Sequence, residues 1–317
     1  MSSPFAPWLN AGEPVLLDGG LGTELERRGY RQLGVLWSAA LVRTNEHAIR
    51  AVHHDYLEAG ANVISTATFQ AALPTLRSTG LHRAEAEDLL RDAVAIAALE
   101  RTQFVRRHPH AKVPLIAASV GPFGASLMNG SEYTGAYDVS RAQLISHHVE
   151  RLRVLSETEA DFIACETIPS LPEALVLMDL LAALPHAPAW ISFTCRDATH
   201  LADGNDLREA LIAAQDVPNL CAIGVNCIAP HLAMSVLETL LHYASAPIIV
   251  YPNASNVWDL TTRQSADLLG PEAFAQESRR WWQAGAQIVG GCCRTTPDHI
   301  RAMAPSYPTS ATTAAVQ

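Results

Sequence analysis

Three cysteines are the residues of this sequence whose type and spacing most directly indicate chemistry. Cys292 and Cys293 are adjacent and follow Gly290 and Gly291, while Cys227 ends a separate apolar run. Adjacent residues of a regular strand point to opposite faces, so both thiols reach one ion only if the backbone bends, and two glycines permit such a bend. Soft thiolates select zinc over hard cations, and three protein ligands leave a fourth position open, as in catalytic zinc sites. The pattern predicts a zinc ion (Zn2+) on the three cysteines.

Two other interpretations of the adjacent pair stay open at this point. Cys292 and Cys293 could form a redox pair, or they could be two small buried residues. A structural zinc ribbon would need a repeated CxxC pattern, which the sequence lacks. The other cysteines, Cys165, Cys195 and Cys221, lie in or beside apolar runs and are expected to be small buried side chains.

The elements that would position the three cysteines repeat along the chain. Short apolar runs rich in Val and Ile alternate with helical patterns, as in parallel sheets whose strands are buried on both faces. The apolar runs are 14–20, 61–68, 113–121, 161–167, 189–195, 220–227, 246–253 and 286–293. The main helical patterns are 46–60, 82–107, 140–158, 171–184, 206–216, 231–244, 271–284 and 297–304.

Eight such units in about 300 residues predict an α/β fold, a single-domain (β/α)8 TIM barrel over residues 1–304. The competing fold is a doubly wound open sheet. The first apolar run is followed by DGGLGTE, which lacks the GxGxxG spacing of a dinucleotide site and so favours the barrel. Residues 305–317 are small and polar, and we expect them to be disordered.

Polar residues gather where the predicted strands end. Active sites of such barrels form at the C-terminal ends of the strands. Asp18 ends the first strand, Thr68 the second, Ser119 the third and Glu166 the fourth, and Asn226 ends the sixth beside its cysteine. We expect these side chains and the three cysteines to converge on one mouth.

Composition restricts the classes of partner. The formal net charge is −10 and no basic stripe is visible, so we expect no nucleic-acid partner. No apolar run approaches the roughly 18–20 residues that span a bilayer, and the N-terminal segment lacks the pattern of a signal peptide. The sequence predicts a cytoplasmic protein that acts on small molecules and does not enter the membrane.

Several segments resemble those of the homocysteine S-methyltransferase family, and the resemblance runs from about residue 14 to 304. The segments are LLDGGLGTELERRG (16–29), SVGPFGASLMNGSEYTGAY (119–137), FIACETIPSLPEA (162–174), GVNCIAP (224–230), VYPN (250–253) and IVGGCCRTTPDHI (288–300). The resemblance implies a (β/α)8 barrel with catalytic zinc on Cys227, Cys292 and Cys293. It further implies that Asp18 and Glu166 hold the amino-acid end of homocysteine.

The resemblance also implies a substrate pocket and a methyl donor. Thr68, Phe69, Ser119 and Asn226 are expected to contact substrate. The segment 128–138 resembles the branch that uses S-methylmethionine or S-adenosylmethionine, so the expected reaction moves a methyl group from a sulfonium donor to the homocysteine thiolate, giving methionine. A sulfonium cation favours an aromatic or acidic wall. The candidates for that wall are Trp37 and Tyr133, with Phe123, Glu132 and Tyr137.

Alternative functions remain for the same residues. One is a methyltransferase that uses betaine, or another thiol or selenol, at the same zinc site. Another is a non-catalytic barrel that binds a thiol or a metal, against which the presence of both Asp18 and Glu166 argues. A redox enzyme built on the adjacent cysteines is the third, and metal content would separate it from the first. The segment ASNVWDLTTRQS (254–265) is shorter than expected between the seventh strand and its helix.

Overall fold

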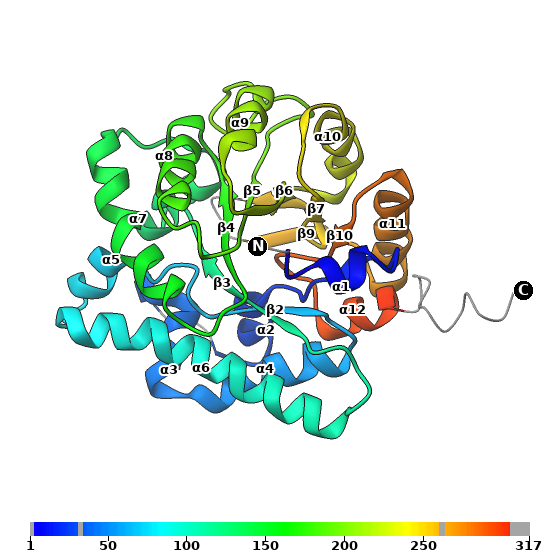
Figure 1. The fold of residues 1–317 in the computed structure, drawn as a ribbon, viewed down its shortest axis with the longest axis horizontal. Coiled ribbons are helices and arrows are strands. Elements are labelled where there is room, and N and C mark those ends of the chain that lie inside the picture. Colours follow the sequence, from blue (N-terminus) through cyan, green and yellow to red (C-terminus); the bar gives the residue numbers. More distant parts are fainter. Residues whose placement is uncertain (1–2, 31–33, 260–263, 305–317) are drawn as a thin grey trace, which may run out of the picture.

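The computed structural model describes residues 3–30, 34–259 and 264–304. Its centre is an eight-stranded parallel sheet in the spatial order β1-β10-β7-β6-β5-β4-β3-β2. A parallel bridge between Leu17 and Val63 joins the first strand of this order to the last, so the sheet closes into a barrel. Helices surround it on the outside (Figure 1). The predicted (β/α)8 barrel is confirmed.

Every predicted strand–helix unit is present. The barrel strands are β1 (Val15–Leu16), β2 (Val63–Ser65), β3 (Leu115–Val120), β4 (Phe162–Ile168), β5 (Ala189–Phe193), β6 (Leu220–Asn226), β7 (Ile248–Tyr251) and β10 (Ile288–Val289). The predicted helices are α4 (Glu46–Glu58), α6 (Arg83–Arg107), α7 (Arg141–Ser156), α8 (Leu171–Ala182), α9 (Leu207–Ala213), α10 (Pro230–Tyr243), α11 (Pro271–Ala284) and α12 (Pro297–Met303). Four further helices lie outside the predicted patterns: α1 (Ala6–Leu9), α2 (Leu21–Arg27), α3 (Ala40–Thr44) and α5 (Leu73–Ser78).

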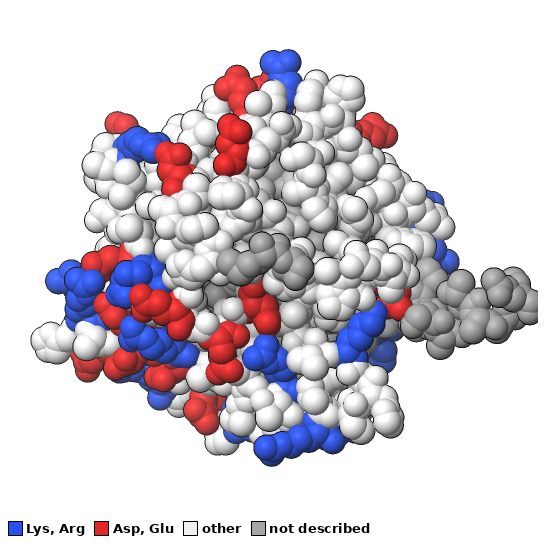
Figure 2. Space-filling model, viewed as in Figure 1, with Lys and Arg blue, Asp and Glu red and all other residues white. Residues whose placement is uncertain are grey.

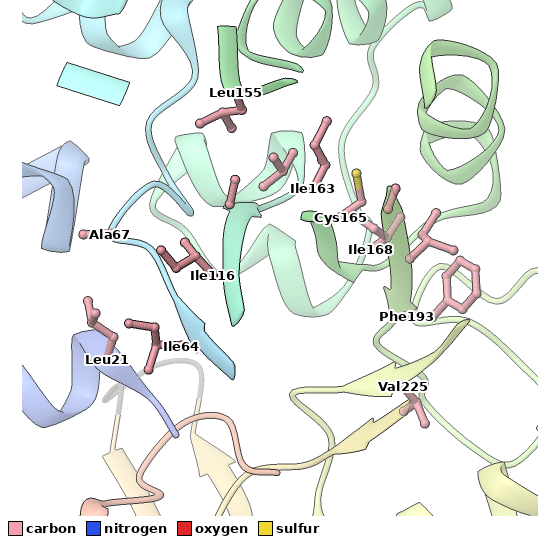
Figure 3. Packing of buried hydrophobic residues seen from close by; sticks show 14 of the residues in the cluster. Leu21, Ile64, Ala67, Ile116, Leu155, Ile163, Cys165, Ile168, Phe193 and Val225 are labelled. Carbon is pink, nitrogen blue, oxygen red and sulfur yellow. The ribbon is translucent and has the colours of Figure 1, made fainter. Parts of the chain in front are cut away.

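Side chains alternate between the inside and the outside of the barrel, as the period of two in a strand requires. In β4, Phe162 and Ala164 join the cluster inside the barrel, whereas Ile163 and Cys165 pack in the layer between strands and helices. Figure 3 shows Ile163, Cys165 and other members of that outer layer. One further step along β4 places Glu166 inward at the C-terminal end. The same alternation therefore aims polar side chains from several strand ends at one point.

The N-terminal end of the barrel is closed by the segment around α1, whose Phe5 joins the cluster inside the barrel; in Figure 1 α1 lies beside β10 and α12. The buried ring of Phe5 stacks on Phe162 with ring centroids 4.3 Å apart and lies 6.2 Å from Trp190. Burying a side chain of this size contributes about 1.5–3 kcal/mol. The barrel interior is therefore apolar and filled at this end.

Local signals set the helix ends. Ser140 accepts a hydrogen bond from the backbone N–H of Gln143 and forms a capping box at the start of α7. Gly60 follows α4 with φ 106°, a conformation in which glycine has no steric cost. Pro172 lies in the first turn of α8, where a missing N–H costs nothing.

An antiparallel hairpin interrupts the unit between β7 and α11. It consists of β8 (Ser255–Asp259) and β9 (Gln264–Leu268). The segment that is shorter than expected at this point in the sequence thus folds as a hairpin in its described residues. The predicted tail 305–317 lies outside the described residues.

Charged side chains of both signs gather over α6 and its neighbours, whereas the surface over α9 and α10 carries fewer charges (Figure 2). Arg83 and Arg91 of α6 pair with Glu87, and Arg153 of α7 joins the same carboxylate. Within the described ranges, no helix combines the length and the apolar character that a membrane span requires.

Candidate active site

A cavity of about 370 Å3 opens at the C-terminal ends of the barrel strands. A pocket of this size accommodates small-molecule ligands. Its lining includes side chains from the strand ends, namely Asp18, Ser119, Glu166, Cys227, Tyr251, Cys292 and Cys293. The structure thus brings together Asp18, Ser119, Glu166 and the three cysteines, as the strand-end rule predicts, and adds Tyr251.

The three cysteines form one cluster. The Sγ atom of Cys227 lies 3.0 Å from that of Cys292 and 3.6 Å from that of Cys293. All three sulfur atoms lie within 4.8 Å of one another. In a tetrahedral site with Zn–S bonds of about 2.3 Å, the sulfur atoms are about 3.8 Å apart, so the cluster fits one ion after small adjustments. Three thiolates are a donor set that a soft divalent cation prefers.

The backbone aims each thiol at the cluster. Cys227 directly follows the inward-pointing Asn226 and has φ 55°, a left-handed conformation that breaks the strand alternation and keeps its side chain at the mouth. The N–H of Cys292 donates to the carbonyl of Pro252 at 2.8 Å. The N–H of Cys293 donates to Asn253 Oδ1 at 3.0 Å. The residues after β7 thus fix both adjacent cysteines.

The two glycines before the adjacent cysteines provide space. A Cβ atom on Gly291 would lie 2.3 Å from Thr295 Cγ2, and one on Gly290 would lie 2.5 Å from Leu17 Cβ. Neither glycine is among the residues with positive φ. The two glycines, predicted to permit a backbone bend, also let the end of β10 pack closely against Leu17 and Thr295.

Hydrogen bonds within the cluster give the three thiols unequal pKa values. Bonds from Cys227 and Cys292 hold the pKa of the Cys293 thiol well below its ordinary value, against the effect of burial. Hydrogen bonding to the other two thiols, together with burial, raises the pKa of Cys292. The other cysteines are separate: burial raises the pKa of Cys165 to about 12, as expected of an inert core thiol.

Asp18 and Glu166 are buried carboxyl groups on the cavity wall. Asp18 accepts the N–H of Ser65 at 2.7 Å and the Ser65 hydroxyl at 3.2 Å. Burial raises the pKa of Asp18 to about 7, opposed by these bonds and assisted by the nearby Glu166. Glu166 accepts the hydroxyls of Ser119 and Tyr251, the latter at 3.0 Å, and burial raises its pKa too. Two desolvated carboxyl groups that share a cavity favour a cationic ligand.

The structure divides the other predicted contact residues into two groups. Trp37, Phe69 and Tyr133 line the cavity with Ser119, and the Tyr133 hydroxyl lies 4.0 Å from Cys293 Sγ. Thr68 and Asn226 are fully buried and stand behind the wall, so their role as substrate contacts stays a prediction.

Hydrogen bonds inside the protein occupy both of these buried side chains. Asn226 Oδ1 accepts the N–H of Thr167 at 2.7 Å, and its Nδ2 donates to Thr167 Oγ1 at 2.8 Å. The same Nδ2 lies 3.8 Å from Cys292 Sγ. Thr68 donates to the Ser119 carbonyl at 2.7 Å. Both side chains thereby hold the wall residues Ser119 and Thr167 in position.

Two further donor-wall candidates lie behind the cavity. Phe123 and Tyr137 contact each other with ring centroids 5.5 Å apart and are absent from the lining, whereas Glu132 is part of it. The Tyr137 hydroxyl donates to Glu173, a fully buried carboxylate of α8. Glu173 also accepts the N–H of Phe123 at 2.6 Å and His148 Nε2 at 2.7 Å. Glu173 thus anchors the segment 123–137, which carries Glu132 and Tyr133 into the cavity.

Sequence reasoning misses charged residues at the cavity rim. Arg294 and Glu26 both line the cavity, and they lie inside the segments IVGGCCRTTPDHI and LLDGGLGTELERRG that indicated the family. Neither residue follows a strand directly, so the rule of polar strand ends does not select them.

Backbone strain is concentrated at the cavity. Among the described residues, six other than glycine have positive φ, and five of them line the cavity. These five are Trp37, Met128, Thr167, Cys227 and Arg294. Such conformations cost on the order of 1–3 kcal/mol each and persist where the surroundings enforce them, which is typical of functional sites.

Comparison with known proteins identifies the family. A model of the homocysteine S-methyltransferase family matches residues 15–307. The homocysteine S-methyltransferase YbgG of Bacillus subtilis (strain 168) is 39% identical over 305 residues, which cover 95% of this chain and 97% of that protein. The chain belongs to the homocysteine S-methyltransferase family.

Relatives of the same family extend the comparison. The homocysteine S-methyltransferase of Escherichia coli (strain K12) is 38% identical over 312 residues, with 95% of this chain and 98% of that protein covered. The crystal structure of the E. coli homocysteine methyltransferase MmuM in its metallated form is similar with a TM-score of 0.87 at 38% identity, covering 96% of this chain and 99% of that one. This protein is thus a methyltransferase of the homocysteine S-methyltransferase family, with a cysteine cluster suited to a metal.

Proposed function

We propose that the protein transfers a methyl group from a sulfonium donor to the thiol of L-homocysteine, giving methionine, at a zinc ion held by Cys227, Cys292 and Cys293. The observation that carries this proposal is the placement of three converging thiols and two buried carboxyl groups in one cavity. The thiols suit a soft metal and a thiol substrate, and the carboxyl groups suit an ammonium.

Homocysteine has both groups that this cavity would recognise. Its α-ammonium would lie at Asp18 and Glu166, which are ionised more readily once a cation is beside them. Ser65 orients Asp18, and Ser119 and Tyr251 orient Glu166. With the ammonium held at the carboxylates, the thiol end can extend towards the cysteine cluster.

The substrate thiol must lose its proton, because the thiolate is the nucleophile. A zinc ion bound by the three cysteines would supply Lewis acidity that lowers the pKa of the homocysteine thiol. The sulfur of homocysteine then forms a bond to the methyl carbon as the bond from that carbon to the sulfonium sulfur breaks. The electron pair of the broken bond stays on the donor sulfur, which becomes a neutral thioether, and the thiol proton passes to solvent.

The charges of the cavity favour a cationic donor. Four carboxyl side chains line it (Asp18, Glu26, Glu132 and Glu166) against one guanidinium, that of Arg294. Trp37 and Tyr133 add aromatic surface, which also stabilises a sulfonium. The demethylated product carries no positive charge on sulfur, so it is held less tightly than the donor. Holding both reactants in one cavity supplies much of the rate by orientation.

A methyl-transfer assay tests the proposal. The protein, loaded with zinc, is incubated with homocysteine and S-methylmethionine, S-adenosylmethionine or betaine, and methionine formation is measured with and without a chelator. We expect turnover with a sulfonium donor that stops when zinc is removed and returns when zinc is added. Faster turnover with betaine would contradict the donor assignment. A disulfide between Cys292 and Cys293 with no bound zinc would favour the redox alternative.

A further inference from the structure

The cavity contains a second pair of charged groups, set apart from the buried carboxyl groups at its floor. Arg294 and Glu26 lie at the rim, where each side chain is about one-third exposed, 30% and 32%. Asp18 and Glu166, in contrast, are buried. The guanidinium of Arg294 lies 3.6 Å from Glu26 Oε2, a loose ion pair instead of a close two-bonded one. The rim therefore presents one cation beside one anion.

The structure holds both rim groups in place. Arg294 has φ 66°, and its N–H donates to Thr23 Oγ1 at 2.9 Å, so the residue after Cys293 is fixed in a left-handed conformation. Glu26 accepts the indole N–H of Trp37 at 3.1 Å. Trp37 is itself in a strained conformation, with φ 45°. A simple surface ion pair would need neither of these strained residues.

The two pairs of charges match different ligands. The floor has two carboxyl groups and no cation, so it recognises an ammonium, such as that of homocysteine, but offers no charge partner to a carboxylate. The rim has a guanidinium and a carboxylate side by side, and this combination complements a zwitterion, because arginine binds carboxylates and a carboxylate binds ammonium. The rim pair also neighbours Cys293 and the aromatic wall of Trp37, where a sulfonium would lie.

We infer that Arg294 and Glu26 bind the α-amino-acid end of the methyl donor, Arg294 through the donor carboxylate and Glu26 through the donor ammonium. This inference rests on the proposed function and adds a requirement to it: the donor is a sulfonium amino acid, not simply a sulfonium. The rim pair thereby selects among methyl donors, while the floor carboxylates bind the acceptor.

Three donors of graded structure test the inference. S-methylmethionine has both a carboxylate and an ammonium, dimethylsulfoniopropionate has only the carboxylate, and trimethylsulfonium has neither. The zinc-loaded protein and the variants Arg294→Gln and Glu26→Gln are assayed with each donor at saturating homocysteine. Arg301→Gln, which removes an exposed arginine paired with Asp298, is the matched control.

The expected result is a pattern across donors. For Arg294→Gln, kcat/KM should fall roughly 10- to 100-fold more for the two carboxylate donors than for trimethylsulfonium, the loss typical of a charge-assisted hydrogen bond. For Glu26→Gln, a similar selective loss should appear with S-methylmethionine alone. Titration calorimetry of S-methylmethionine into protein without homocysteine should show weaker binding by the same factors. Arg301→Gln should match the unaltered protein throughout.

Other patterns overturn the inference. Equal losses with all three donors, or a raised KM for homocysteine in Arg294→Gln, would mean that the rim pair is structural or binds the acceptor. Unchanged donor preference in both variants would have the same meaning. A failure of the proposed function looks different, because the unaltered protein would then transfer no methyl group from any sulfonium donor to homocysteine. Zinc content measured in every variant separates loss of the adjacent Cys293 site from loss of donor binding.

Discussion

The sulfur atoms of Cys227 and Cys292 lie 3.0 Å apart although 65 residues separate them in the chain. The contact joins the end of β6 to the turn after β10, on the two sides of β7 in the barrel. Folding of the barrel, and not a local motif, therefore creates the cluster. A ligand set distributed in this way should lose its metal when any one member is removed.

We expect Cys227→Ser to reduce zinc content to background and to abolish methyl transfer, because a neutral hydroxyl is a poor substitute for a thiolate ligand. The measurement is metal analysis of the purified variant together with the methionine assay. Cys221→Ser removes a partly exposed thiol outside the cluster and serves as the control. Normal zinc content in Cys227→Ser would refute the ligand assignment.

The affinity for homocysteine should depend on pH through Asp18. The pKa of this carboxyl group is raised to about 7 by burial in the protein without substrate. Below that pH the group retains its proton, and binding of an ammonium must displace it, so KM for homocysteine should rise by up to roughly tenfold for each unit of pH below about 7. The check is KM at several pH values with zinc content verified at each. In Asp18→Asn the dependence should flatten and KM should be high at every pH; an unaltered slope would point to another group.

The same carboxyl group should reduce the stability of the substrate-free protein. Because the pKa of Asp18 is higher in the folded protein than its ordinary value, the folded chain retains a proton that the unfolded chain has released. Stability from this group therefore falls as pH rises from about 4 to about 7. We expect Asp18→Asn to increase the free energy of unfolding at pH 8 by at most about 4 kcal/mol, as measured by urea denaturation. A destabilised variant would show that the hydrogen bonds from Ser65 outweigh desolvation.

Glu173 should matter to both stability and donor binding. Glu173→Gln cannot accept all the hydrogen bonds that reach the carboxylate from Phe123, Tyr137 and His148, so we expect a loss of about 1.5–3 kcal/mol in the free energy of unfolding. The segment it anchors carries Tyr133, so KM for the donor should rise more than KM for homocysteine. The exposed Glu157→Gln, which removes an ion pair with Arg153, should change stability by less than about 1 kcal/mol. Equal losses of unfolding free energy in the two variants would contradict the role of Glu173 as an anchor of the segment 123–137.

Phe5→Ala should separate folding from function. The ring fills the N-terminal end of the barrel, so its removal leaves a cavity that costs about 3–5 kcal/mol. The active site lies at the opposite ends of the strands, so KM for both substrates should stay unchanged below the unfolding temperature. Thermal unfolding and steady-state kinetics on the same preparation provide the test, and a raised KM would indicate coupling along the barrel.

Much of the barrel could be predicted from the sequence because buried parallel strands leave an unambiguous apolar pattern. Asp18, Glu166 and the cysteines could then be selected because each follows a predicted strand, and active sites of such barrels form at the C-terminal ends of the strands. Short elements such as α1 have no comparable periodicity. The importance of Phe5 depends on a stacking contact with Phe162, 157 residues away in the sequence, which no local pattern encodes.

The sequence does not show whether a residue at a strand end lies on the cavity wall or is buried behind it. Thr68 and Asn226 stand at the same strand ends as true wall residues, and only the three-dimensional contacts show that their polar atoms are occupied inside the protein. Arg294 and Glu26 lie in a turn and a helix near the rim, where charged residues are common for reasons of solubility. Their relevance appears only when the cavity brings them together.

The five strained residues at the cavity have a consequence for protein engineering. Replacing a left-handed residue other than glycine with glycine relieves steric strain in the folded protein, so a selection for heat resistance alone can favour changes at Thr167 and Arg294. Such a selection would enrich for robust but inactive barrels. Directed evolution of this methyltransferase should therefore screen every round for turnover as well as for thermal tolerance.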